Sequence, residues 1–343
     1  MGESQKDRRL SMENVTIKDI AGACGVSYAT VSRTLNRRSG VHPATREKIL
    51  RVADLLGYSP NLHARSLKTQ KTRIIGLILP DISNPFFADI ASSVNEIVYG
   101  QGYNSILCST DWNASIEEKQ LSLLIDQRVD GLIFKPSPDL TDRYAELPLP
   151  KVMISNSQDP RFSWVEIDNV EGGRIAADHL ITGCGYRYPA FISGARASRS
   201  NQDRLQGFRQ RLAELDVPLP DERISFGAYS IESGYRSVEK LDRGGSEADC
   251  FFCGNDLIAL GALQYLSEKD RPVPDRFGVV GFDDVYFASL PQIQLTTVRQ
   301  PRRRIGALAA ETLSRMIESE ERSGETQIML RPELVARHTT SEH

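Results

Sequence analysis

The sequence predicts an α/β protein: an N-terminal three-helix head, then two doubly wound α/β lobes in which helices cover both faces of a mainly parallel sheet. Three observations support this prediction. The chain has 343 residues, which is too long for one typical domain. Residues 14–60 carry helix signals separated by glycine turns. From Ile74 onward, short apolar runs alternate with amphipathic stretches, and this alternation is typical of a parallel sheet between helices.

The head is expected to begin with a short amphipathic helix. Residues 1–13 show no periodicity and are interpreted as a disordered arm. Thr16 and Asp19 fit a capping box, and apolar side chains then recur at helical spacing as far as Cys24. Gly25 supplies the positive φ that a tight turn needs.

A second helix, capped by Ser27, follows the turn. Val31 and Leu35 are expected to point inward, so the opposite face is exposed. The side chains predicted to contact DNA from this helix are Ser27, Tyr28, Ala29, Thr30, Ser32, Arg33 and Asn36. Arg33 can form bidentate hydrogen bonds to a guanine, and Ala29 can touch a thymine methyl group. An ordinary solvated polar face is the alternative interpretation.

A third helix is expected to begin at Pro43 and to end at Gly57, which closes a small core. The helix-turn-helix domain is therefore placed at residues 14–60, and a hinge with its linker at residues 61–72. Residues 61–67 contain too little apolar surface to form a stable helix alone. We expect this hinge to fold only against a partner.

Charge is distributed unevenly along the chain. The first 68 residues hold 12 Lys and Arg against 6 Asp and Glu, whereas the rest of the chain holds 30 against 39. The front segment can therefore attract an anion that the remainder repels. A surplus of this size also occurs on ordinary protein surfaces, so the charge alone does not assign a partner.

Three runs in the head form a specific motif: Val-Thr-Ile-Lys-Asp-Ile-Ala at 15–21, Gly-Val-Ser-Tyr-Ala-Thr-Val-Ser-Arg at 25–33 and Gly-Tyr-Ser-Pro-Asn at 57–61. Together they resemble the amino-terminal signature of the lactose-repressor (LacI/GalR) family. By that resemblance Tyr28, Ala29 and Arg33 contact the major groove of operator DNA. It also implies a hinge helix in the minor groove that includes Ala64, Leu67 and Lys68, with Leu67 as a wedge between base steps.

The remaining chain predicts two lobes. The first series of apolar runs and helical stretches covers residues 74–79, 86–99, 105–107, 116–127 and 131–134. The second series covers residues 188–193, 206–215, 248–253 and 277–282. Two such lobes leave a cleft at the carboxyl ends of their strands, where open α/β sheets bind ligands.

Further runs extend the family resemblance: Ile-Asp-Asn at 167–169, Arg-Leu-Gln-Gly-Phe at 204–208, Cys-Gly-Asn-Asp at 253–256, Gly-Phe-Asp-Asp at 281–284 and Leu-Thr-Thr-Val at 295–298. They imply a periplasmic-binding-protein-like type I core over residues 73–343, which binds an effector and dimerises. The expected lobes are residues 73–185 with 301–328 and residues 186–300 with 329–343. Crossings between the lobes are expected near Gly185, Gln300 and Met329.

Ten residues are candidate effector contacts: Asp81, Phe86, Phe87, Asp168, Ser200, Arg204, Tyr229, Asn255, Asp283 and Gln300. Arg204 offers a rigid set of donors, Asp283 offers acceptors, and aromatic faces can stack on a sugar. Asp283 could instead cap a helix, and the two phenylalanines could lie in the core. A sugar or sugar derivative is the expected effector, with a purine or another metabolite as the alternative.

Other protein classes fit the sequence less well. No phosphate loop, Gly-x-Gly-x-x-Gly or His-Glu-x-x-His motif is present, so neither an enzyme nor a cofactor or metal site is expected. Cys250 and Cys253 fall in a predicted strand and should face opposite sides of it. A sugar-binding transport protein without DNA-binding function remains an alternative, but the chain shows no secretion signal, no membrane-spanning run and a DNA-contacting head.

The resemblance also predicts assembly and regulation. Helix-turn-helix dimers bind half-sites related by two-fold symmetry, so a homodimer on a palindromic operator is expected. Residues 90–98 and 302–317 are the expected dimer surface. A cytoplasmic repressor under allosteric control by the effector is the function that these expectations describe.

Overall fold

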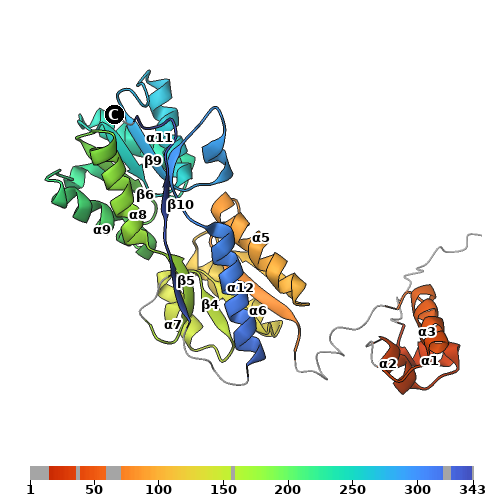
Figure 1. The fold of residues 1–343 in the computed structure, drawn as a ribbon. Helices are drawn as coiled ribbons and strands as arrows, with labels where there is room; N and C mark the ends of the chain where they lie inside the picture. Colours follow the sequence, from red (N-terminus) through yellow and green to blue (C-terminus); the bar gives the residue numbers. More distant parts are fainter. Residues whose placement is uncertain (1–14, 36–38, 59–70, 156–158, 320–325, 342–343) are drawn as a thin grey trace, which may run out of the picture. The chain divides into compact units, whose positions relative to one another are not determined.

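The structure is a computed structural model that describes residues 15–35, 39–58, 71–155, 159–319 and 326–341. The chain folds as two compact units, residues 1–72 and residues 73–343. We call them the helical unit and the two-lobed unit, and Figure 1 shows the helices of the first and the two sheet-containing lobes of the second. The expected arm at 1–13 and residues 61–70 of the expected hinge lie outside the described residues.

The helical unit contains α1 (Ile17–Cys24), α2 (Tyr28–Leu35) and α3 (Pro43–Leu55). The predicted capping box of Thr16 and Asp19 is present, and Gly25 ends α1 with a φ of 66°. All three helices contribute to a small core of Ile20, Cys24, Val31, Ile49 and Ala53. Leu56, at the C-cap of α3, is 41% exposed and lies outside this core.

Lobe one is built on parallel strands in the order β11-β5-β4-β3-β1-β2. The strands are β1 (Ile74–Leu79), β2 (Asn104–Ser109), β3 (Gly131–Phe134), β4 (Lys151–Met153), β5 (Ser163–Ile167) and β11 (Gln327–Leu330). The helices are α5 (Pro85–Gly100), α6 (Ala114–Asp126), η1 (Pro138–Leu140), α7 (Thr141–Ala145) and α12 (Arg302–Glu318). Successive side chains of β1 face opposite sides, because Leu77 packs with α5 and α12 while Ile78 packs with α6.

Lobe two has a sheet in the order β12-β10-β9-β8-β6-β7, in which only β12 is antiparallel to its neighbour. Its strands are β6 (Pro189–Ser193), β7 (Ile224–Phe226), β8 (Cys250–Cys253), β9 (Gly278–Asp283), β10 (Thr296–Arg299) and β12 (Glu333–Val335). Its helices are α8 (Asn169–Ala177), η2 (Asp178–Gly183), α9 (Arg199–Glu214), η3 (Asp221–Arg223), α10 (Ile231–Arg243), α11 (Asp256–Glu268) and η4 (Tyr286–Ser289). Cys250 and Cys253 are free, buried and packed into different apolar clusters, as predicted.

The chain crosses between the lobes at Asp168, at Gln300–Pro301 and at Arg331–Pro332. The expected crossing near Gly185 is therefore wrong, because α8 lies against α9 of lobe two (Figure 1). The expected crossing near Met329 is displaced as well, since Met329 still pairs with β5 in the sheet of lobe one. The first segment of lobe one consequently ends at β5 rather than after the following helix, and α12 and β11 complete the lobe.

Part of the expected dimer surface is internal. Helices α5 and α12 pack on each other so closely that a Cβ atom on Gly306 would lie 2.6 Å from the carbonyl oxygen of Ile90. Ile90, Val94 and Val98 are buried in this contact and in the core of lobe one. The expectation that residues 90–98 as a whole face a second subunit is wrong for these three side chains.

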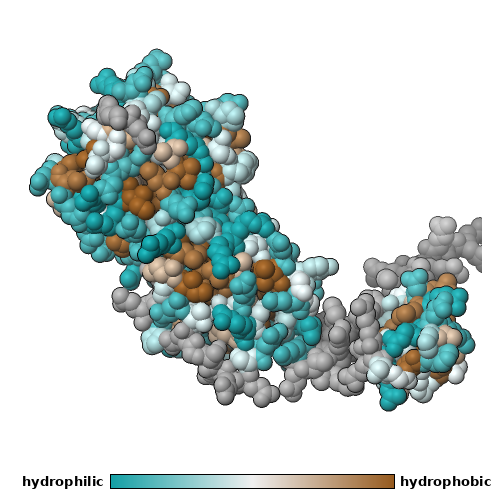
Figure 2. Space-filling model, viewed as in Figure 1, coloured by the Kyte–Doolittle hydropathy of each residue, from teal (hydrophilic) through white to brown (hydrophobic). Residues whose placement is uncertain are grey.

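Most large apolar side chains of the two-lobed unit are buried in clusters inside the lobes. Figure 2 shows a mainly hydrophilic viewed face, on which hydrophobic residues form separate patches. None of the helices in the described ranges is long and apolar enough to span a bilayer.

Candidate functional site

The exposed face of α2 is the first candidate site. Val31 and Thr34 are buried beneath it, whereas Tyr28, Ala29 and Arg33 are exposed. The Tyr28 side chain is 56% exposed, although an aromatic ring would normally be partly covered. The local fold thus presents a phenol, a methyl group and a guanidinium together on one helix face.

Ser27 and Thr30 have structural roles at the start of α2. The backbone N–H of Thr30 donates to Ser27 Oγ at 3.2 Å, and the two hydroxyl oxygens lie 2.8 Å apart. Ser32 is half-buried on the helix. The other residues predicted to contact DNA, Asn36, Ala64, Leu67 and Lys68, lie outside the described residues.

The second candidate site is a pocket between the two lobes. It is lined by Asn84, Phe86, Phe87, Trp112, Lys135, Ile154, Glu166, Ser198, Ser200, Arg204, Tyr229, Asn255, Asp283, Gln300 and Ile305. Eight of the ten predicted effector residues are in this lining, although they come from distant parts of the sequence. The cavity of about 40 Å³ has room for a few water molecules.

Asp81 and Asp168 are not in the lining of this pocket. Asp81 accepts hydrogen bonds from the backbone N–H and the hydroxyl of Ser83 at 2.8 and 2.6 Å. Asp168 caps α8 by accepting from the backbone N–H of Glu171 at 2.9 Å. Both carboxylates therefore stabilise local backbone in this structure.

Arg204, from α9, lies at the lobe-two side of the pocket. Its Nε donates to Asn169 Oδ1 at 2.8 Å, Nη1 donates to the carbonyl oxygen of Gly254, and the guanidinium lies 3.6 Å from the ring centre of Phe282. Only 6% of Arg204 is exposed. These contacts fix a buried guanidinium in one orientation, which is what recognition of a polar ligand requires.

Asp283 ends β9 at the same side of the pocket with a φ of 111°, a strained value for a residue other than glycine. Its Oδ1 accepts from Gln300 Nε2 at 2.5 Å. Burial raises the pKa of Asp283 to about 6, although Arg204, Gln300 and Arg302 partly offset this effect. The site thus holds a carboxyl group that is costly to ionise, on a residue with a strained backbone.

Lobe one contributes Glu166 from β5 and Lys135, which directly follows β3. Glu166 Oε1 accepts from Ser200 Oγ at 2.8 Å, and Ser200 belongs to α9 of lobe two. This hydrogen bond joins the lobes across the pocket. Burial lowers the pKa of Lys135, and the charge of Glu166 opposes that shift.

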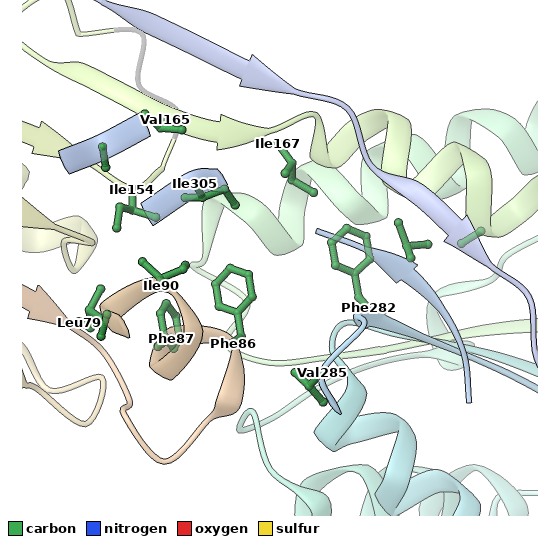
Figure 3. Packing of buried hydrophobic residues seen from close by; sticks show 14 of the residues in the cluster. Leu79, Phe86, Phe87, Ile90, Ile154, Val165, Ile167, Phe282, Val285 and Ile305 are labelled. Carbon is green, nitrogen blue, oxygen red and sulfur yellow. The ribbon is translucent and has the colours of Figure 1, made fainter. Parts of the chain in front are cut away.

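Aromatic rings form the apolar wall. The Trp112 and Tyr229 rings are stacked with centroids 4.6 Å apart, so an aromatic side chain of lobe one meets one of lobe two. The Phe87 ring lies 6.0 Å from that of Trp112. Figure 3 shows Phe86 and Phe87 on α5 within a cluster of buried apolar side chains from both lobes, which also contains Phe282.

The sequence-based prediction missed three chemically important lining residues, Trp112, Lys135 and Glu166. A signal for Lys135 was present, because it directly follows an apolar strand and the carboxyl ends of strands border such clefts. Glu166 is a buried carboxylate among the apolar side chains of Trp164, Val165 and Ile167 in β5. Trp112 lies in a loop and had no comparable signal.

Comparisons with known proteins agree with this architecture. Residues 16–61 match the model of bacterial regulatory proteins of the lacI family, and residues 177–340 match a periplasmic binding protein-like domain. The chain is 37% identical to the HTH-type transcriptional regulator DegA of Bacillus subtilis, over 95% of this chain and 98% of that protein. It is 34% identical to the HTH-type transcriptional repressor PurR of Vibrio parahaemolyticus, over 95% and 99%.

Solved structures give the same result. The lac repressor dimer bound to operator and the anti-inducer ONPF matches with a TM-score of 0.86 and 26% identity, over 96% of this chain and 99% of that one. The transcriptional regulator CelR in complex with cellobiose matches with a TM-score of 0.71 and 29% identity, over 95% and 99%. Both similarities extend over the helical unit and the two-lobed unit.

Proposed function

This chain belongs to the lacI family of bacterial regulatory proteins, and from that premise we propose that a sugar or sugar derivative, bound between its lobes, controls its affinity for operator DNA. The family relationship makes it a DNA-binding transcriptional repressor with a ligand-binding domain. The observation that carries the effector proposal is the convergence of eight separately predicted residues on one pocket. The proposed function includes no catalytic step. We also propose that the protein acts in the cytoplasm, where its operator DNA lies.

For DNA contact we propose that α2 enters the major groove. The exposed Arg33 guanidinium is suited to a guanine edge, and the exposed Ala29 methyl is suited to a thymine methyl. Ser27 and Thr30 are proposed to fix the start of the helix, since their hydroxyls bond each other and the backbone. The minor-groove role of Ala64, Leu67 and Lys68 remains part of the proposal on the family resemblance alone.

For the effector we propose a sugar because the pocket combines two kinds of surface. The aromatic side chains, among them Trp112 and Tyr229, can cover a C–H face, while Arg204 and Asp283 offer donors and acceptors to hydroxyl groups. A purine is the second candidate, because the stacked pair of Trp112 and Tyr229 would also suit a flat base. Asp81 and Asp168 are left out of the proposed contact set.

For regulation we propose a homodimer on a palindromic operator. Effector binding would change the arrangement of the lobes and so the spacing of the two hinge segments in the dimer, which permits or prevents their folding on DNA. The cross-lobe hydrogen bond of Ser200 and Glu166 is one contact that such a movement would change.

Selection from random DNA duplexes tests the DNA-binding part. Purified full-length protein should enrich a palindrome. Arg33→Ala should weaken binding by about 1–3 kcal/mol and relax the base preference at one symmetric position of each half-site. Arg51→Ala, on the exposed surface of α3, is the matched control and should leave every base preference unchanged. If no sequence is enriched, or if Arg33→Ala selects the same bases as the wild type, the proposed role of α2 is wrong.

A further inference from the structure

Lys135 is an under-coordinated cation in the wall of the pocket. Its backbone is fixed at the end of β3, where its N–H donates to the carbonyl oxygen of Ile78 at 3.0 Å. In the described part of the chain, its ammonium has one hydrogen-bond acceptor, the carbonyl oxygen of Ile154, at the long distance of 3.4 Å. An ammonium carries three donors, and removal of a charge from water without full compensation is costly.

The carboxylates of the pocket supply only part of that compensation, and neutral groups bind them as well. Glu166 Oε1 accepts from Ser200 Oγ and from Asn169 Nδ2, at 2.8 and 2.9 Å. Asp283 Oδ1 accepts from Gln300, and burial raises the pKa of Asp283 to about 6, so ionisation of this carboxyl is costly. The charges of Glu166 and Asp283 favour the protonated ammonium of Lys135, but burial outweighs them, because the pKa of Lys135 is lowered overall.

A second unused donor faces the pocket from lobe two. Asn255 is 2% exposed, and its Oδ1 accepts the backbone N–H of Ile258 at 2.9 Å as the cap of α11. This bond fixes the orientation of the amide. Its Nδ2 has no hydrogen-bond partner among the described residues, although Asn255 lines the pocket. A buried donor without a partner is rare in native proteins, so this amide is available to an acceptor in the pocket.

We propose that the effector is a sugar acid, a polyhydroxylated monocarboxylate whose carboxylate pairs with Lys135. Its hydroxyl groups accept from Asn255 Nδ2 and donate to Asp283, and its C–H face packs on the aromatic wall. This inference rests on the proposed function, because it assigns the ligand of the same pocket. The ligand would thus connect a cation of lobe one with polar groups of lobe two.

A carboxylate suits this pocket better than a phosphate does. The charged side chains in the lining are Lys135 and Arg204 against Glu166 and Asp283. The Arg204 guanidinium is engaged by Asn169, Gly254 and the Phe282 ring, which leaves the Lys135 ammonium as the under-coordinated cation. A single cation matches a monoanion, whereas a phosphate monoester carries nearly two negative charges at neutral pH.

Matched ligand pairs test the inference on the full-length protein. Thermal shift and then calorimetry would compare D-galacturonate with D-galactose, D-glucuronate with D-glucose, and D-gluconate with D-glucitol, with D-glucose 6-phosphate as the phosphate arm. At least one acid should bind, at least tenfold more tightly than its neutral partner and than the phosphate.

Variants test whether Lys135 causes the preference for the acid over its neutral partner. Lys135→Met should weaken binding of the acid at least tenfold and reduce the difference between the acid and its neutral partner. Lys135→Arg keeps the charge and should retain binding of the acid. Lys119→Met makes the same change at an exposed position of α6 and is the control. Far-ultraviolet circular dichroism verifies that each variant is folded. If a variant does not fold, the comparison of ligand pairs on the wild-type protein still tests the inference.

Three results would overturn the sugar-acid inference: no acid of the panel binds, a neutral sugar or the phosphate binds as tightly as the acids, or folded Lys135→Met protein binds the acid like the wild type. A neutral sugar that binds and changes operator affinity would overturn this inference and leave the proposed function intact. If no ligand of any arm changes operator affinity, the effector part of the proposed function fails instead.

Discussion

Asp283 is a buried carboxyl residue in the lining of the pocket. It is 4% exposed, its φ is 111°, and burial raises its pKa to about 6. Strain and desolvation of this kind are typical of functional sites, where other parts of the structure offset the cost. The carboxylate is therefore expected to lower the stability of the protein at neutral pH while it provides an acceptor for the effector.

Asp283→Asn tests whether the buried carboxylate lowers the stability of the protein. Burial raises the pKa of Asp283 from its ordinary value near 4 to about 6 in the folded chain, so its ionisation weakens folding as pH rises from about 4 to about 6, and the effect is complete above pH 6. An amide does not ionise and tolerates a positive φ, so the variant should be about 1–3 kcal/mol more stable at pH 7.5. The difference in the free energy of unfolding between the variant and the wild type should shrink as pH falls toward 5. Urea unfolding at each pH measures this difference. Effector binding by the variant should be weaker. A variant less stable than the wild type at pH 7.5 would contradict the assignment.

The residues that sequence could identify are those in long local motifs. Arg204 and Asp283 stand in runs that resemble the family, and both line the pocket. Lys135 and Trp112 stand in no such run, and only the folded arrangement of β3 and of the loop before α6 brings them to the pocket. Asp168 shows the opposite case, because it stands in a motif but caps α8.

At the scale of elements, the contact of α8 with α9 determines where the lobes divide. The two helices approach through glycines: a Cβ on Gly207 would lie 1.8 Å from the carbonyl oxygen of Val170, and a Cβ on Gly173 would lie 2.1 Å from that of Arg204. This contact also positions Arg204, which lies on α9 one turn before Gly207. The same helix thus carries both the close contact with α8 and a charged side chain of the pocket.

Gly207→Ala should therefore cost more than its helix propensity gains. The added methyl group must separate α8 from α9, for which we expect a loss of about 3 kcal/mol in the free energy of unfolding. Gly100→Ala at the end of α5 is the control, because a Cβ there meets nothing within 4 Å, and it should be neutral or slightly stabilising. Denaturant unfolding of both variants measures the difference. Equal stability of the two would show that the close approach of α8 and α9 is not needed.

The elements themselves were mostly predictable. The capping box of α1, the strands β1 and β3 and the helices α5, α6, α9 and α12 follow from local pattern. The crossing at Asp168 was not predicted, because local pattern does not show which sheet the segment after β5 covers. The burial of Ile90, Val94 and Val98 against α12 depends on a contact between segments that are about two hundred residues apart, which no local pattern reveals.

At the scale of the whole molecule, the two candidate sites lie in different compact units. The helical unit exposes Tyr28, Ala29 and Arg33 on one helix, and the two-lobed unit encloses the pocket. The positive surplus of the first 68 residues and the negative surplus of the rest favour DNA contact by the helical unit. The central claim is that occupation of the pocket changes DNA affinity.

The most direct test measures operator affinity with and without a pocket ligand. Fluorescence anisotropy would determine the Kd of the full-length protein for its selected operator, at one salt concentration, with and without a saturating ligand found by thermal shift. A coupling free energy of about 1–3 kcal/mol, typical of allosteric proteins, predicts a change in Kd of about 5- to 150-fold. A ligand that binds the pocket and leaves the Kd unchanged would contradict the account.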